Sequence, residues 1–326
     1  MVRLINKFIK KREFGIIMII VILSILLTFK SDAFLKWDNI IDFLRSNAVI
    51  GIMAFGMLPV LISGGIDLSV SSTISLCAVV IGKFMIAFPG SNPLFVMIVA
   101  MLVGGMVGLI NGIIITKFKI PPIVATLGTM TIILGAVLLY TGGFWINELP
   151  QWFKAFGSIK IGIPIQVILF AVVGIITALL LKYTLIGRGI YAVGGSVLSA
   201  DRVGYNVNKI LIFIYCFAGM MTGLAAAVHI SIVGQVDPNT YTGYELDVIS
   251  TVVLGGASTM GGIGTVLGTT LGVVLMAILK NGLVLARIPT YWQKVAMGMV
   301  ILLAVSVDVI KRQREQARLI RVDVEE

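Results

Sequence analysis

Apolar runs long enough to cross a lipid bilayer recur along most of this chain. A transmembrane helix needs about 20 mostly apolar residues, and a mean hydropathy of +1.07 with only 12% charged residues leaves too few polar groups to cover a water-soluble globule. The approximate limits of the ten predicted spans are Phe14–Phe29, Ser46–Ile62, Leu68–Phe88, Leu94–Thr116, Ile123–Tyr140, Ile163–Leu181, Ile210–Val233, Leu246–Leu254, Ile263–Leu279 and Val295–Ile310. The sequence therefore predicts an all-α, polytopic transmembrane helical bundle that forms a single domain over residues 1–326.

Two of these runs differ from a plain span. The first also resembles a signal peptide, but an acidic residue, Asp32, within the would-be cleavage site and the length of the run favour an uncleaved span. The eighth run is short and is followed by Gly255 and Gly256. We expect a broken or re-entrant segment there, buried in protein.

The segment between the first two spans is amphipathic. In FLKWDNIIDFLRSN, apolar residues recur at helical spacing on the side opposite Asp38, Asp42 and Arg45. This pattern is typical of a helix that lies in the membrane interface, and we expect it on the outer side.

The positive charges indicate how the spans are oriented. Sixteen of the 25 Lys and Arg residues fall in segments that the span order places on one side of the membrane, and cytoplasmic loops are the ones that collect such cations. We therefore place residues 1–13, 183–208 and 311–326 in the cytoplasm. The net charge of +10 then reflects orientation in the bilayer, and no nucleic acid partner is expected.

The longest polar insert between spans covers residues 182–209. Its Gly-Gly-Ser sequence is suited to start a short helix, Val197–Val203, and Gly204 is suited to end it. Such a helix on the cytoplasmic face can dock a soluble partner. An ordinary solvated loop is the alternative.

Two short segments resemble each other. LINGIIITKFKIPP at 109–122 and LKNGLVLARIPT at 279–290 each have Asn-Gly ahead of a cation and Ile-Pro. The first is predicted inside and the second outside, as the copies of an inverted repeat would be. Such repeats commonly build transport pathways at their interface.

Three glycine-rich stretches interrupt the spans, at Ser63–Ser72, Gly104–Gly112 and Leu254–Gly268. Glycine in a membrane helix most often lets neighbouring helices approach closely, which is our expectation for the middle stretch. The outer two also carry hydroxyl groups, so that unwound backbone and polar side chains can line a cavity. The residues predicted to line the translocation pathway are Gly64, Gly65, Asp67, Ser69, Asn111, Gly255, Gly256, Gly261, Gly262 and Asn281.

Some chemistry is excluded by what the chain lacks. It has one histidine, His229, and no H-E-x-x-H or G-x-S-x-G motif, so neither a catalytic nor a metal site is predicted. Its only Gly-Lys pair lacks the preceding P-loop glycine, so the chain cannot cradle ATP phosphates by itself. Cys77 and Cys216 lie in apolar runs and imply no disulfide framework.

An ion-coupled carrier would need ionisable groups at membrane depth, and only Asp67 and His229 are candidates. We interpret Asp67 as a cap of the following helix, through Ser69, rather than as a proton relay. We interpret His229 as a hydrogen-bonded packing residue.

Several motifs, in order along the chain, resemble one family. SGGIDLSVSS, GRGIYAVGG and VVLGGASTMGGIGTVLGTTLG, followed by KNGL and YWQ, are similar to the permeases of carbohydrate ABC importers of the ribose, xylose and arabinose type. The similarity covers the chain from Ile40 to Asp308. IPPIVATLGTMTIILGAVLLYTGGFWINELP and RIPTYWQ most resemble the autoinducer-2 and rhamnose importer branch.

The resemblance implies a multi-pass protein of the bacterial cytoplasmic membrane that works with a second permease, identical or related, two cytoplasmic ABC ATPases and an extracytoplasmic sugar-binding protein. ATP and Mg²⁺ would bind to the ATPases, and this chain would bind no cofactor. The family usually has arginine at Asp201, so this chain departs from it there. The residues that the resemblance assigns to coupling are Gly187, Arg188, Gly189, Gly194, Gly195, Ala200, Arg202 and Gly204.

We therefore expect a non-enzymatic importer subunit that passes a monosaccharide or sugar-like molecule inward by alternating access, driven by the ATPases. Ala200 and Gly204, four residues apart, would form a small-residue face that an ATPase groove encloses. The alternatives are an ion-coupled secondary sugar carrier, a membrane subunit of another complex, and autoinducer-2 in place of a nutrient sugar.

Overall fold

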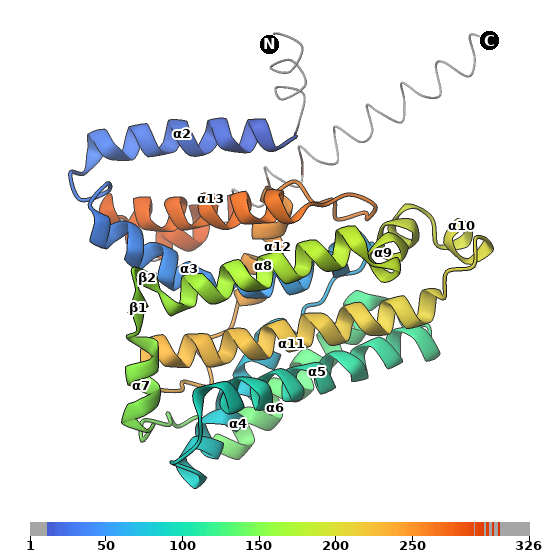
Figure 1. The fold of residues 1–326 in the computed structure, drawn as a ribbon, viewed down its shortest axis with the longest axis horizontal. Helices are drawn as coiled ribbons and strands as arrows, with labels where there is room; N and C mark the ends of the chain where they lie inside the picture. The colour runs from blue at the N-terminus through green and yellow to red at the C-terminus, as the bar shows by residue number, and fades with distance from the viewer. Residues whose placement is uncertain (1–11, 290, 297, 300–301, 303–305, 307–326) are drawn as a thin grey trace.

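The computed structural model describes residues 12–289, 291–296, 298–299, 302 and 306, and the chain is built mainly from long helices that run side by side (Figure 1). The helices are α2 (Arg12–Lys30), α3 (Trp37–Ile62), α4 (Val70–Ala87), α5 (Pro93–Lys117), α6 (Pro122–Thr141), α7 (Gln151–Gly157), α8 (Ile165–Tyr183), α9 (Leu185–Gly195), α10 (Val197–Arg202), α11 (Val207–Val233), α12 (Tyr244–Leu254) and α13 (Val266–Leu285). Two strands of two residues each, β1 (Lys160–Ile161) and β2 (Ile163–Pro164), pair antiparallel between α7 and α8. The prediction of an all-α polytopic bundle is confirmed.

Eight helices in the described part of the chain are long and apolar enough to cross a membrane, and each matches a predicted span. They are α2, α3, α4, α5, α6, α8, α11 and α13. The short eighth run forms α12, which has 11 residues and ends immediately before Gly255. The predicted span Val295–Ile310 lies mostly outside the described residues, as do the segments 1–11 and 311–326.

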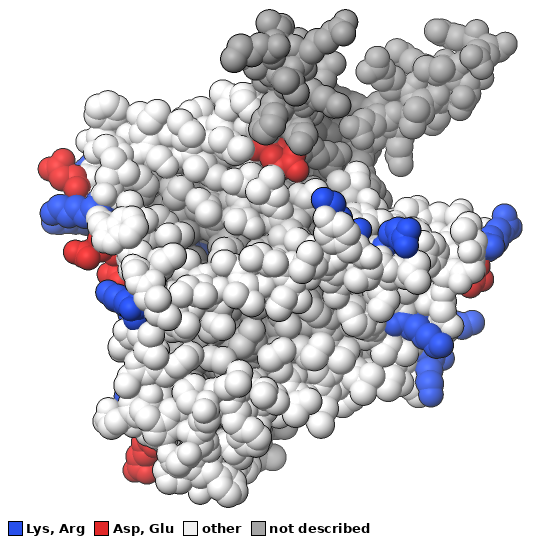
Figure 2. Space-filling model, in the orientation of Figure 1, with Lys and Arg blue, Asp and Glu red and all other residues white. Residues whose placement is uncertain are grey.

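The two ends of the bundle differ in charge. We call the end that carries α9 and α10, on the right in Figure 1, the inner end, and the end that carries α7 and the β1–β2 pair the outer end. Figure 2 shows mostly Lys and Arg at the inner end and side chains of both signs at the outer end. This asymmetry agrees with the predicted orientation, in which the inner end faces the cytoplasm.

The central helix of the bundle is α3, in which every residue from Asn47 to Ile62 is buried. The interfacial helix predicted around residues 34–47 is not a separate element, because most of it forms the first turns of α3. Its polar residues are held by protein groups: the Arg45 Nη2 donates to the Gly157 O at 2.8 Å, and the Asn47 Nδ2 donates to the Phe43 O at 2.8 Å. These bonds let the polar turns pack against the protein.

Helices α5 and α11 approach each other most closely through glycine. A Cβ atom added at Gly104 would lie 2.1 Å from the O atom of Gly219, and one added at Gly219 would lie 2.0 Å from the O atom of Gly104. One turn along α5, a Cβ at Gly108 would lie 2.0 Å from the O atom of Tyr215. The prediction that the stretch Gly104–Gly112 serves close helix packing is confirmed.

Candidate functional site

The inner end carries the short helix that the sequence predicts. Helix α10 begins after Ser196, whose Oγ accepts a hydrogen bond from the N–H of Ser199 at 3.2 Å. It ends before Gly204, which has a φ of +92°, a conformation that glycine adopts without strain. Both the start and stop signals of this helix were therefore correctly identified from the sequence.

The structure adds a helix, α9, where the sequence predicts only a polar lead-in to α10. Four of its 11 residues are glycine, and each glycine destabilises a helix by about 1 kcal/mol. Packing offsets this cost, because Ile190 and Val193 are buried. Gly187 and Gly189 are also buried, and a Cβ at Gly187 would lie 2.3 Å from the O atom of Leu180. The exposed coupling candidates are Arg188, Gly195, Arg202 and Gly204.

The structure corrects the docking face predicted for α10. Only 2% of Ala200 is exposed, so it cannot form an outward face with Gly204. The chain turns back after α10, with the N–H of Tyr205 donating to the Ala200 O at 3.1 Å. The outward surface of α10 instead carries two apolar side chains, Val197 and Leu198, which are 55% and 62% exposed, beside the exposed Ser199, Asp201 and Arg202.

The end of α9 meets both glycine-rich loops of the inner end. A Cβ at Gly194 would lie 1.8 Å from the O atom of Ile62 and 2.5 Å from the N atom of Gly262. The Gly262 N–H itself donates to the Ile62 O at 2.7 Å. A Cβ at Gly261 would lie 2.9 Å from both the Gly194 O and the Gly64 N. Residues assigned separately to coupling and to the pathway are thus in direct backbone contact.

A chain of polar side chains follows the first of these loops. The carboxylate of Asp67 accepts hydrogen bonds from the N–H of Ser69 at 2.9 Å and from its hydroxyl at 2.6 Å. The Asn111 Nδ2 donates to the Ser69 Oγ at 2.8 Å, and a Cβ at Gly65 would lie 2.6 Å from the hydroxyl of Tyr215. These bonds hold Asp67 against Ser69, the residue immediately before α4, so the predicted interaction through Ser69 is present.

Asp67 lies in the loop between α3 and α4, and only 2% of it is exposed. Burial raises the pKa of its carboxyl from an ordinary value of 3.8 to about 6, while the hydrogen bonds from Ser69 act in the opposite direction. The carboxyl is therefore close to titrating near neutral pH.

Gly255 and Gly256 lie at the break after α12. A Cβ at Gly255 would lie 2.5 Å from the O atom of Gly268, so this residue packs α12 against α13. Gly256 has a φ of +88° and only Ile16 within reach of an added Cβ, at 4.0 Å. The structure places this pair in helix packing and chain reversal.

A cleft of about 800 Å³ opens at the outer end among α3, α12 and α13. Asn281 is the one predicted pathway residue among those that line it. Its side chain pairs with that of Asn39, each Nδ2 donating to the other's Oδ1, at 2.9 and 3.1 Å. This amide pair joins α13 to α3 across 242 residues of sequence.

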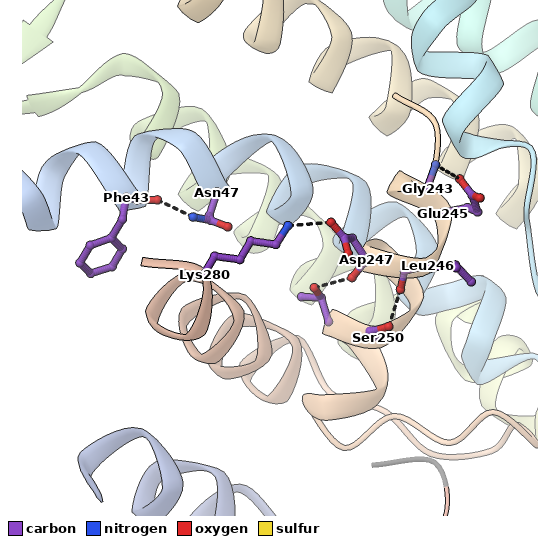
Figure 3. Close-up of polar contacts among 9 residues, drawn as sticks. Phe43, Asn47, Gly243, Glu245, Leu246, Asp247, Ser250 and Lys280 are labelled. Carbon is purple, nitrogen blue, oxygen red and sulfur yellow. Dashed lines mark hydrogen bonds and ion pairs between the residues drawn. The ribbon is translucent and has the colours of Figure 1, made fainter. Parts of the chain in front are cut away.

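An ion pair in the wall of this cleft was not expected from the sequence. The Lys280 Nζ lies 2.6 Å from an Oδ2 of Asp247 and joins α13 to α12 (Figure 3). The predicted ninth span ends at Leu279, whereas α13 continues to Leu285, so Lys280 lies inside the helix. A lysine in an apolar helix is a signal of a polar cavity or partner, and it becomes visible only once the helix end is known.

His229 lies in α11 near the outer end. Its Nδ1 is 3.0 Å from the hydroxyl of Tyr241, and its ring makes edge contacts with Tyr241 and Tyr244. The interpretation of His229 as a hydrogen-bonded packing residue is confirmed.

Comparison with known proteins gives consistent matches over most of the chain. Residues 39–305 match the family described as "Branched-chain amino acid transport system / permease component". The chain is 38% identical to the ribose import permease protein RbsC of Bacillus subtilis over 90% of either chain. It is 37% identical to RbsC of Haemophilus influenzae over 92% of this chain and 93% of that protein.

A second group of relatives is named for a different substrate. The chain is 35% identical to the autoinducer 2 import system permease protein LsrC of Enterobacter sp. (strain 638), over 90% of this chain and 85% of that protein. No solved structure matches the chain.

Proposed function

Because the chain belongs to the branched-chain amino acid transport system / permease component family, and is a multi-pass permease subunit of an ABC importer, we propose that it passes a ribose-like monosaccharide into a bacterial cell. The ribose permeases that it matches are 35–38% identical and are covered over 90–93% of their length. The autoinducer 2 permeases are 34–37% identical and are covered over 71–85%. The percentage identities of the ribose permeases and of the autoinducer 2 permeases overlap, so they do not distinguish the two groups. The ribose permeases are matched over more of their length, which favours a sugar as the substrate.

The observation that carries the proposal is the contact of α9 with the two glycine-rich loops. At Gly194 the backbones of three segments meet with no room for a Cβ atom. A displacement of α9 and α10 therefore cannot be absorbed at this point and must move the ends of α3 and of the loop before α13. This is the property that a coupling element needs.

We infer that the partner ATPase docks on the exposed apolar surface of α10. Val197 and Leu198 offer that surface. The exposed charges near it are Arg188, Asp201 and Arg202, a net positive set that can pair with an acidic rim. ATP and Mg²⁺ would be bound by the ATPase, whose closure would displace α10 and, through Gly194, the loops. A sugar-binding protein would deliver the substrate at the outer end.

The competing mechanism is an ion-coupled carrier that works alone. Asp67 is hydrogen-bonded to Ser69, and His229 is hydrogen-bonded to Tyr241. Both groups that the sequence offers for ion coupling are thus engaged in structural bonds. This favours the mechanism driven by ATP.

Uptake of labelled D-ribose by proteoliposomes tests the proposal. The permease with its ATPase should accumulate ribose only when the binding protein is outside and ATP with Mg²⁺ is on the ATPase side. Uptake that persists without ATP and stops when ion gradients are dissipated would establish a secondary carrier. Uptake of autoinducer 2 without uptake of ribose would assign the chain to the other group.

Docking is tested separately with Leu198→Asp, which places a charge on the apolar surface of α10. The amount of ATPase that co-purifies should fall at least tenfold. The matched control is Leu35→Asp. Leu35 is 59% exposed near the outer end, far from α10, so this variant should retain the ATPase. Equal co-purification with the two variants would mean that another surface docks the ATPase.

A further inference from the structure

The outer cleft is well separated from the glycine-rich contacts of the inner end. Its residues come from the first turns of α3, the start of α12 with the loop before it, the end of α13, and Gln293, Lys294 and Gly298 beyond α13. Its volume of about 800 Å³ falls within the range of about 300–1,000 Å³ that is usual for small-molecule sites. The cleft is therefore large enough for a monosaccharide together with bound water.

The charges that line the cleft cancel. Among the lining residues that the structure describes, two are acidic and two are basic: Asp42, Asp247, Lys280 and Lys294. The ion pair between Asp247 and Lys280 fixes one carboxylate and one ammonium group side by side (Figure 3). A wall of this kind has no net attraction for an anion or a cation, and it offers strong hydrogen-bond partners to a neutral ligand.

The uncharged polar groups of the wall suit hydroxyl groups. The amides of Asn39, Asn47 and Asn281 line the cleft, together with the hydroxyls of Ser46 and Thr242. An amide both donates and accepts hydrogen bonds, as each hydroxyl group of a sugar does. Because Asn39 and Asn281 hold each other in place, part of this wall is ordered before a ligand arrives, which lowers the entropic cost of binding.

The cleft also has an apolar part. Phe43, Ile50 and Val284 are among its lining residues. The ring of a sugar presents C–H groups between its hydroxyls, and apolar side chains can cover them without leaving polar atoms unpaired. An amphipathic wall therefore fits a cyclic polyol better than it fits a lipid chain.

We propose that the outer cleft is a low-affinity binding site for a neutral cyclic polyol, a monosaccharide, that is occupied between release from the binding protein and passage inward. This inference rests on the proposed function and names the place where this chain itself contacts the substrate. The affinity is expected to be weak, because a transport site must also release its ligand.

The test is saturation-transfer NMR on the complex of permease and ATPase in nanodiscs, with D-ribose and without the binding protein. Ribose should give a saturable signal with a dissociation constant in the millimolar range. Ribose 5-phosphate should not compete with it, because the cleft has no net positive charge for the phosphate. If ribose 5-phosphate competed with ribose at equal concentration, the proposal that the cleft selects a neutral ligand would be wrong.

Two serine variants locate the signal. Ser46 is exposed and lines the cleft, so Ser46→Trp should fill it and lower ribose binding at least tenfold, together with uptake. Ser158 is exposed at the outer end but is not among the lining residues, so Ser158→Trp should leave both unchanged. Melting temperatures of both variants within about 2 °C of wild type would show that folding is preserved.

The outcomes separate this inference from the proposed function. If the wild-type complex takes up ribose but gives no saturable signal, or if Ser46→Trp binds and transports as wild type does, the cleft is not the site and the proposed function stands. If the wild-type complex takes up no sugar with its binding protein, both fail.

Discussion

Lys119 and Arg287 share an unusual backbone conformation, with φ angles of 54° and 56°, and they are the only non-glycine residues with positive φ in the described part of the chain. Each comes two positions after the last residue of a helix, α5 or α13. Each is followed by Ile-Pro, and the proline carbonyl accepts bonds from the N–H groups three and four residues on, in both cases.

The same turn therefore occurs at opposite ends of the bundle, after helices that run in opposite directions across it. This is the arrangement that an inverted repeat requires, and the two copies are the segments whose sequences resemble each other. Their asparagines are also placed alike. Asn111 bonds to Ser69 at the inner end, and Asn281 bonds to Asn39 at the outer end.

The left-handed turn at Lys119 predicts a stability pattern. A left-handed residue other than glycine is strained by about 1–2 kcal/mol, and a β-branched side chain increases the strain. Lys119→Gly should leave the melting temperature in detergent unchanged or raise it, and Lys119→Val should lower it by several degrees. The same pair of variants at Arg287 should behave alike, and a valine that is tolerated at either position would contradict the assigned turn.

The contact between Gly104 and Gly219 predicts an unusually severe alanine substitution. Ala favours a helix over Gly by about 1 kcal/mol, but at Gly104 its Cβ would meet a backbone oxygen at 2.1 Å. Gly104→Ala should therefore lower the folded yield by gel filtration. Gly128 and Gly135 of α6 have no atom within 4 Å of an added Cβ, so the alanine variants there should fold normally. Equal yields from all three would show that α5 and α11 can move apart at little cost.

Gly194 and Gly195 are neighbours with opposite expectations. A Cβ at Gly194 would meet the backbone at 1.8 Å, whereas nothing lies within 4 Å of one at Gly195. Gly194→Ala should separate α9 from the loops, so that the ATPase still co-purifies while ribose uptake falls at least tenfold. Gly195→Ala should retain uptake. Normal uptake by a well-expressed Gly194→Ala variant would remove this contact from the coupling path.

The buried carboxyl of Asp67 predicts a dependence of stability on pH. Its pKa is raised from 3.8 to about 6 in the folded protein, so the stability that this group contributes is fully present below its unfolded pKa and is lost as the pH rises through its folded pKa. Asp67→Asn can still accept both bonds from Ser69 and has no such loss. Its advantage over wild type in thermal unfolding should grow as the pH is raised from below 3.8 to above 6, by up to about 3 kcal/mol in all, and should stay constant at higher pH.

The control for this experiment is Asp67→Ala, which removes the acceptor of the Ser69 bonds. It should be less stable than Asp67→Asn at every pH, because the buried Ser69 donors lose their acceptor. If the difference in stability between the Asp67→Asn variant and the wild-type protein did not change with pH, the carboxyl would not titrate in this range.

Membrane orientation is tested at the start of α10. Ser196 is exposed at the inner end, and a Ser196→Cys variant that lacks Cys77 and Cys216 should react with a membrane-impermeant maleimide only after the cells are opened. Ser158→Cys in the same background should react in intact cells. The reverse pattern would invert the topology and place α10 outside.

The long elements of this fold were predictable because hydropathy and helix signals are local. Ser196 and Gly204 mark the ends of α10 by themselves. Helix α9 was missed because its glycines oppose a helix locally and only its tertiary contacts stabilise it. The inward position of Ala200 follows from the chain reversal at Tyr205, which helical spacing alone does not reveal.

The outer cleft was less accessible to sequence reasoning. Asn281 is among the residues predicted from the sequence to line the translocation pathway. Its partner Asn39 is 242 residues away, and no local pattern joins the two. Lys280 lies one residue beyond the predicted end of its span, so its ion pair with Asp247 was hidden because the predicted span stopped before the helix does.

The glycine contacts between α5 and α11 also restrict the transport cycle. Two helices whose backbones touch cannot slide or tilt against each other without collision, so we expect them to move as one rigid body during transport. The relative motion must then occur between this body and the helices around it. Spin labels on α5 and α11 should keep a constant separation throughout turnover, and that pair can serve as the fixed reference against which the movement of α9, α12 and α13 is measured.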